Sequence, residues 1–177
     1  MKKKKFTPLT AKELRPEGWL RQQLKIQAEG LSGHLDLIWP DIRDSKWISG
    51  DKEGWERVPY WLDGFIPLAY LLEDEELKKR AARYIDAILE RQEEDGWICP
   101  CSREERSTYD VWAAFLICKV LVLYYECSGD DRIEQAVYRA MHNLLLHVTN
   151  STLFNWSAAR WYECLVPLLW LYERRPE

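Results

Sequence analysis

The sequence predicts an all-α protein made of α/α hairpin repeats that amount to about half of an (α/α)6 toroid. Three observations support this fold class. Apolar residues recur with helical spacing along most of the 177-residue chain. Helices that are apolar on every side alternate with helices that carry one apolar stripe. No segment shows the alternation that is typical of a half-buried strand. We expect residues 1–14 to form a tail and residues 15–177 to form one partial barrel domain.

The first predicted helix runs from Trp19 to about Leu31, where Gly30 and Gly33 end it. A segment rich in Gly, Asp, Ser and Trp follows from Ser32 to about Val58, and we expect it to be a loop. Ordered loops of that length inside a compact domain are often functional. Pro59 then suits the first turn of the next helix.

Five further helices alternate in type. A helix that is apolar all round must be buried on all sides, whereas a striped helix lies at the surface. The pattern therefore predicts an inner and an outer ring. Gly96 is expected to end the first outer helix as a left-handed cap, with Trp97 packing back on the repeat. The predicted inner helices are 61–72, 111–125 and 161–172, and the predicted outer helices are 77–92 and 133–148.

The inner helices also repeat in sequence. Residues 60–73 and 160–173 align without gaps at an offset of 100, with five identities in fourteen positions. Pro67 and Pro167 match, and each is expected to kink its helix. The repeating unit is one helix pair of about 50 residues. Three pairs would leave a six-pair ring open, which predicts self-association or a C-terminal remainder of the barrel as a partner.

The formal net charge is −4, so we expect neither nucleic acid nor an anionic membrane as a partner. The run Lys2 to Lys5 is interpreted as a solvated terminus. The longest apolar stretch, 111–125, contains Lys119 and is too short to span a bilayer. No signal peptide is visible, which predicts a cytoplasmic location.

The five cysteines form an odd number, which argues against a disulfide framework. Cys118 and Cys164 lie in apolar helical runs and are expected to be small core residues. Cys99 and Cys101 form a lone C-x-C with no second Cys or His pair at zinc spacing, so no metal site is predicted in this chain.

Ten Trp and nine Tyr are an unusually large number, and a surplus of these residues suits a site that stacks on sugar rings. The stretches that open the predicted inner helices mix acids or Arg with these aromatics, as a sugar site requires. The candidate substrate-binding residues are His34, Trp55, Glu56, Arg57, Tyr60, Trp61, Asp63, Tyr109, Asp110, Arg160 and Trp161.

Several of these residues also have a structural interpretation. Asp110 is expected to cap the helix that follows it and to offset the helix dipole. Asp63 and Glu163 lie one turn inside apolar helices, where an unpaired charge is costly, so each must be paired or must face a wet pocket. His34 lies in the loop after the first helix, from where it could line the pocket.

Five segments resemble the N-terminal part of beta-L-arabinofuranosidase-like proteins, which form glycoside hydrolase family 127 and its relatives. They are RPEGWL at 15–20, QAEGLSGHLD at 27–36, EGWER at 53–57, PYWLDG at 59–64 and DGWI at 95–98. The resemblance implies an (α/α)6 catalytic barrel that hydrolyses glycosides, often L-arabinofuranosides or related plant glycans. Family members use zinc held by Glu and Cys, a Cys nucleophile and a Glu acid/base in the later half of the barrel.

The family's zinc motif has no match in this chain, because there is no Cys-Cys pair and Cys99 and Cys101 do not fit it. No catalytic or metal residue is therefore carried over, and the catalytic residues are expected outside this chain. Two alternatives remain open: a non-catalytic α/α-repeat module that binds carbohydrate or protein, and another toroid enzyme, such as an unsaturated uronyl hydrolase or a sugar epimerase.

Overall fold

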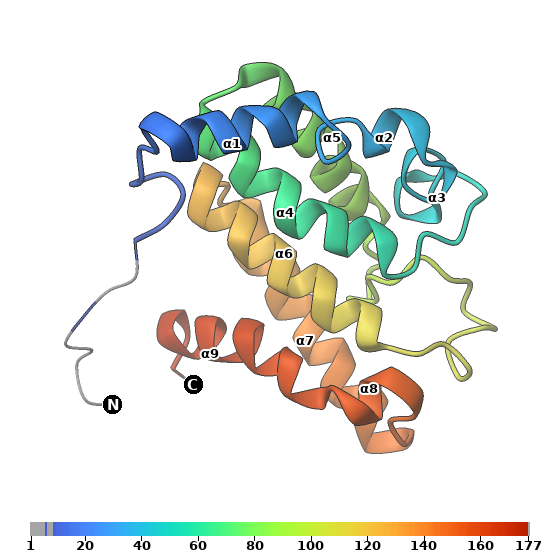
Figure 1. Ribbon diagram of the computed structural model, residues 1–177. Helices are drawn as coiled ribbons and strands as arrows, with labels where there is room; N and C mark the ends of the chain where they lie inside the picture. The colour runs from blue at the N-terminus through green and yellow to red at the C-terminus, as the bar shows by residue number, and fades with distance from the viewer. Residues whose placement is uncertain (1–5, 7–8, 177) are drawn as a thin grey trace.

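The computed structural model describes residue 6 and residues 9–176 (Figure 1). Over these residues the protein is all-α, as predicted, and the strand-like pairing they contain is one isolated parallel bridge between Ser45 and Lys52. The run Lys2 to Lys5 lies outside the described residues, and the tail 1–14 is described only in part. The α-helices are α1 Gly18–Glu29, α2 Leu35–Ile38, α3 Pro40–Arg43, α4 Arg57–Leu72, α5 Glu75–Arg91, α6 Trp112–Ser128, α7 Arg132–Asn150, α8 Asn155–Ala159 and α9 Leu165–Arg174, with short 3-10 helices η1 Lys46–Ile48 and η2 Trp161–Cys164.

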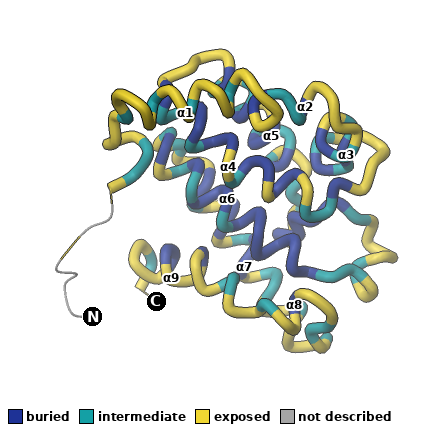
Figure 2. Tube along the Cα trace, in the orientation of Figure 1, coloured by how far each residue is buried: buried dark blue, intermediate teal, exposed yellow. Residues whose placement is uncertain are grey.

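The helices form two layers. α4, α6 and α9 lie side by side, α5 packs on α4, and α7 packs on both α6 and α9 (Figure 1). α4 and α6 are buried over most of their length, whereas α5 and α7 each bury one stripe (Figure 2). The predicted division into inner and outer helices is therefore confirmed for these four helices. Their local ends follow the expected chemistry: Pro59 lies in the first turn of α4, and the Asp74 carboxylate caps α5.

The third predicted inner helix is different. The chain from 161 to 174 divides into η2 and α9, with Pro167 in the first turn of α9. A proline clashes with the carbonyl four residues earlier, which favours a break at this point. Leu168 is 40% exposed and Leu169 is 59% exposed, so the prediction that this helix is buried on every side is wrong.

The predicted loop from Ser32 to Val58 contains the short helices α2, α3 and η1, so the prediction of a loop is wrong for these stretches. Local chemistry explains these turns. Pro40 begins α3, and the Ser45 hydroxyl accepts a hydrogen bond from the backbone N–H of Trp47 at the start of η1.

Core side chains also bind the backbone of this segment. Trp61 donates from Nε1 to the carbonyl of Ser32 at 3.0 Å, and the Tyr84 hydroxyl donates to the carbonyl of Ile42 at 2.9 Å. Trp47 donates from Nε1 to the carbonyl of Trp55 at 3.0 Å.

A buried carboxylate makes a further attachment for the same segment. Asp36 is only 2% exposed and is paired with Arg80 of α5, which also donates to the carbonyl of Gly33 at 2.7 Å. The segment is therefore held against α4 and α5 along its length.

Gly96 has a role other than the predicted helix cap. α5 ends at Arg91, and Gly96 lies in the turn that follows, with a φ of +93° and its N–H bonded to the carbonyl of Glu93. A Cβ at this position would overlap the backbone carbonyl of Arg139 in α7. Glycine is needed for both the left-handed backbone and the close approach of α7. Trp97 is 5% exposed and packs on the repeat, as predicted.

All five cysteines are free thiols within the described part of the chain. Cys118 is fully buried in α6, which confirms its prediction as a core residue, and burial raises its pKa to about 12. Cys164 is only half-buried at the end of η2, because the side of α9 beyond it is open to solvent. Within the range that the structure describes, no helix is both long enough and apolar enough to cross a membrane.

Candidate functional site

A cleft of about 680 Å³ lies where three distant segments meet. They are the turn before α4, the residues that lead into α6, and the short helix α8. The structure thus brings together the three helix openings that the sequence singles out. The residues that line the cleft are Glu53, Trp55, Thr108, Tyr109, Asp110, Asn155, Trp156 and Ala159.

Aromatic rings form a layered platform beside the cleft, with Trp112 as its base. Trp112 is 2% exposed and stacks on Trp156, with ring centroids 5.4 Å apart and an interplanar angle of 26°. Trp55 and Tyr60 meet the Trp112 ring edge-on at 5.3 and 5.9 Å. Trp156 is 48% exposed, so its ring reaches solvent while the buried Trp112 ring supports it.

Charged groups surround this platform in pairs. The Arg160 guanidinium lies 5.2 Å from the ring centroids of both Trp112 and Trp156, a cation–π arrangement. Glu163 accepts a hydrogen bond from Trp112 Nε1 at 2.7 Å and forms an ion pair with Arg160 at 3.3 Å. Of the two arrangements that the sequence allows for Glu163, the structure therefore has the paired one.

Asp63 is also paired. Its carboxylate lies 2.8 Å from Lys119 Nζ, and this bond links α4 to α6. The Asp63 and Lys119 side chains are 31% and 41% exposed, so the pair also reaches solvent. Sequence reasoning did not place Lys119 at the site, although a lone charge inside an apolar helix signals that a partner is required.

Asp110 caps two helices with one carboxylate. Its Oδ1 accepts hydrogen bonds from the backbone N–H groups of Trp112 at 3.1 Å and Ser157 at 3.0 Å. Its Oδ2 accepts from the N–H of Trp156 at 2.9 Å. Asp110 thus binds the first backbone N–H of α6 from the position before the N-cap residue Val111, and its bonds to α8 join the third segment of the cleft to the second.

The remaining candidates near the start of α4 occupy different surroundings. Glu56 precedes α4 and pairs with Arg57, whose guanidinium lies 5.8 Å from the ring centroid of Trp39. Tyr60 is 45% exposed, and burial of its remaining surface raises the pKa of its hydroxyl. Trp61 is 6% exposed and belongs to the core, so its ring is not part of the cleft surface.

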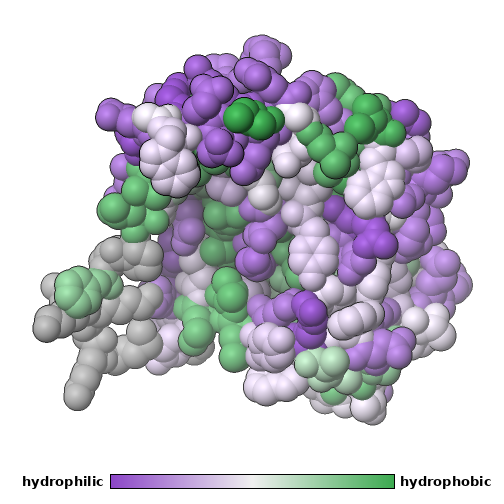
Figure 3. Space-filling model, viewed as in Figure 1, coloured by the Kyte–Doolittle hydropathy of each residue, from purple (hydrophilic) through white to green (hydrophobic). Residues whose placement is uncertain are grey.

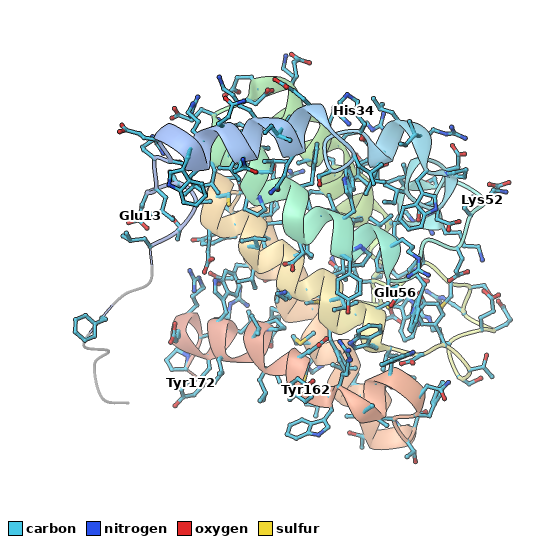
Figure 4. The ribbon with its side chains drawn as sticks, viewed as in Figure 1. Glu13, His34, Lys52, Glu56, Tyr162 and Tyr172 are labelled. Atoms are coloured by element: carbon cyan, nitrogen blue, oxygen red, sulfur yellow. The ribbon has the colours of Figure 1, made fainter. Side chains whose placement is uncertain are left out.

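The other candidate residues either lie away from the cleft or have their polar group buried. His34 lies directly before α2, with Nδ1 2.8 Å from the Gly30 carbonyl, and Figure 4 shows it well apart from Glu56 at the start of α4. Trp161 is exposed but lines a separate apolar groove between α7 and α9. Tyr109 lines the cleft, with its hydroxyl buried and without a hydrogen-bond partner among the described residues, and burial raises its pKa.

Sequence reasoning missed the residues that organise the platform. Trp112 and Trp156 lie in the predicted helix openings, but their stacking across the fold is visible only in the structure. The assembled site offers an open aromatic face with hydrogen-bonding groups at its edge. Every carboxylate in it is engaged by a cation or by N–H groups, which suits binding and orientation of a ligand. No group of three His, Cys, Asp or Glu side chains in the described range could hold a metal.

Comparison of the chain with protein-family models, with curated proteins and with solved structures finds no match. The site is therefore interpreted from its own geometry.

Proposed function

We propose that this chain forms the sugar-binding wall of a glycoside hydrolase that acts on L-arabinofuranosides or related plant glycans, within an α/α toroid of which it supplies about half. The observation that carries the proposal is the half-exposed Trp156 ring, supported from below by Trp112. A flat aromatic face of this kind stacks on the apolar face of a sugar ring. Arg160 beside the ring, and the polar side chains of Glu53, Thr108 and Asn155 that line the cleft, are donors and acceptors of the kind that sugar hydroxyls need.

The proposal assigns binding to this chain and assigns no catalytic residue to it. Glycoside hydrolysis uses two carboxyl groups with different protonation states on either side of the scissile bond. Here Asp110 accepts three backbone N–H groups, Glu163 is held by Trp112 and Arg160, and Asp63 is held by Lys119. Carboxylates engaged in this way position a ligand rather than transfer protons to it.

Sugar binding can be tested by titrating the chain with L-arabinose, arabino-oligosaccharides and a uronate, using tryptophan fluorescence and calorimetry. Trp156→Ala removes the exposed ring and is expected to weaken binding about two- to tenfold, since an aromatic contact is worth roughly 0.5–1.5 kcal/mol beyond area burial. Trp19→Ala is the matched control, because Trp19 is 77% exposed on α1. Equal effects of the two substitutions, or no binding by any sugar, would refute the proposal.

A non-catalytic α/α-repeat module is the second candidate, and the engaged carboxylates favour it. Hydrolysis assays on aryl arabinofuranosides test whether this chain has catalytic activity of its own. Binding that depends on Trp156, without turnover by this chain, agrees with both the wall of an enzyme and a binding module. Turnover that Trp156→Ala abolishes would show that the chain carries its own chemistry and would exclude the module.

A further inference from the structure

The charged residues that line the cleft are both acidic. Among the described residues that form its wall, Glu53 and Asp110 carry carboxylates and the others are uncharged. Figure 3 shows hydrophilic and intermediate residues over the starts of α4 and α6, in contrast to the hydrophobic residues that gather over α9. A ligand in the cleft therefore meets acidic groups directly, whereas basic groups act on it from behind the wall.

The basic side chains around the cleft are engaged by other carboxylates. Arg160, beside the aromatic platform, is paired with Glu163 at 3.3 Å and so adds no net charge. Lys46 lies 3.1 Å from Glu53, but it also borders a neighbouring pocket together with Glu105. The hydrogen bond to Glu53 and the charges of Glu53 and Glu105 raise the pKa of Lys46. One ammonium thus serves two carboxylates and does not cancel both.

The charge of Asp110 is not compensated by a cation. Its partners are three neutral backbone N–H groups, and it forms no ion pair with Lys or Arg in the described part of the chain. Oδ2 accepts one of these groups, which leaves it with capacity for one more donor. Burial raises the pKa of the Tyr109 hydroxyl, and the negative charges of Glu53 and Asp110 raise it further. The two carboxylates therefore act on the same part of the cleft.

The rest of the wall suits a positive charge as well. The rings of Trp55, Tyr109 and Trp156 line the cleft, and Trp156 reaches solvent. A cation within about 6 Å of an aromatic ring centroid is attracted by the negative face of the ring. A neutral sugar gains only stacking and hydrogen bonds from such a wall. A cationic sugar gains the attraction of the rings and carboxylates in addition, and an anionic sugar is repelled by the same carboxylates.

We propose that the cleft selects sugars that carry a protonated nitrogen, such as imino sugars, and discriminates against uronates. The inference rests on the proposed function, because the aromatic rings hold the sugar while Glu53 and Asp110 favour its charge. Cation–π contacts and exposed ion pairs each contribute modestly, so the expected preference over a neutral sugar of the same shape is about three- to thirtyfold.

Calorimetry with two matched pairs of ligands measures this preference. Imino-L-arabinitol has a protonated nitrogen in place of the ring oxygen, and anhydro-L-arabinitol is its neutral counterpart. Galacturonate and galactose form the pair for negative charge. Imino-L-arabinitol should bind more tightly than anhydro-L-arabinitol, and galacturonate should bind more weakly than galactose. Both differences should shrink at high ionic strength, because salt screens exposed charges.

Two substitutions should change the ratio of the imino and anhydro affinities in opposite directions. Glu53→Gln removes one negative charge and should lower the ratio several-fold. Lys46→Met leaves Glu53 without its cation and should raise the ratio. The two side chains are 54% and 37% exposed, so both variants should keep the helical circular-dichroism spectrum. Glu29→Gln is the matched control, because Glu29 is exposed at the end of α1, and it should leave the ratio unchanged.

The outcomes separate this inference from the proposed function. A ratio near one, a ratio that Glu53→Gln leaves unchanged, or a preference for galacturonate over galactose would each overturn the inference. If neutral sugars bind through Trp156 without any preference for charge, the inference fails and the proposed function stands. If imino-L-arabinitol binds and no neutral sugar does, the charge preference stands and the proposed function fails. Absence of binding by all four ligands overturns both.

Discussion

The carboxylate of Asp110 caps α6 and α8 at once, so Asp110→Ala is expected to cost more stability than the loss of an ordinary helix cap. Three backbone N–H groups, those of Trp112, Trp156 and Ser157, bond to it at 2.9–3.1 Å. Two of them begin α8, which is also linked to the start of α6 by the stacking of Trp156 on Trp112.

The magnitude follows from these bonds. Loss of one N-cap costs about 0.5–2 kcal/mol, and hydrogen bonds to a charged group contribute about 1.5–3 kcal/mol each when the partner cannot reach water. Asp110 is half-buried, so water replaces part of what is lost. We expect a decrease in the free energy of unfolding of about 2–4 kcal/mol for two caps. Urea unfolding followed by circular dichroism should shift its midpoint by roughly 1–2 M.

Asp74→Ala is the matched comparison, because Asp74 caps only α5, through the N–H groups of Glu76 and Leu77 at 3.0 and 3.1 Å. It should cost about 1 kcal/mol. It should also leave sugar binding intact, whereas Asp110→Ala should weaken binding by releasing Trp156. The reasoning is refuted if the two substitutions cost the same, or if Asp110→Ala leaves the unfolding midpoint unchanged.

Two further predictions concern the turn after α5 and the outer helix α7. Gly96→Ala should lower the free energy of unfolding, measured in urea, by about 2 kcal/mol or more, because the added Cβ would overlap the carbonyl of Arg139. Gly129→Ala is the control: Gly129 has a φ of +75° and open space around it, so the substitution should cost only about 1 kcal/mol. Burial chiefly lowers the pKa of His147 below 6.5, so the neutral ring stabilises the fold above pH 6.5, and this contribution is lost as pH falls through the lower, folded-state pKa. His147→Gln should flatten that part of the stability–pH curve, and the exposed His142→Gln should not; the opposite result would contradict the assignment.

The helices predicted most closely are those whose burial follows from the spacing of apolar residues in their own sequence. α5 and α7 each carry an apolar stripe, and α4 and α6 are apolar all round, so their positions follow from periodicity within a few residues. The burial of α9 could not be predicted in this way. Its sequence resembles that of α4, but burial also requires neighbours, and those neighbours are absent from the described residues.

The candidate site was predictable as a set of segments but not as a set of contacts. Aromatic and charged residues at three helix openings indicated where the cleft would form. The stacking of Trp112 on Trp156 and the pairing of Asp63 with Lys119 join residues 44 and 56 positions apart in the sequence. Pairings over such distances depend on how the layers pack, which local patterns do not encode. Gly96 illustrates the same limit, because its requirement for glycine comes from the carbonyl of Arg139 in another helix.

The segment between α1 and α4 is attached to the core by the side chains of Trp61, Tyr84 and Arg80, which bond to its backbone or to Asp36. Trp55 lies in this segment and lines the cleft. This part of the cleft wall is therefore already ordered in the folded protein. Binding of a ligand does not incur the entropy cost of ordering it. One consequence is that affinity can be lowered from a distance. A change such as Tyr84→Phe, far inside the helix layers, would loosen this part of the wall and weaken binding without removing any group that touches the ligand.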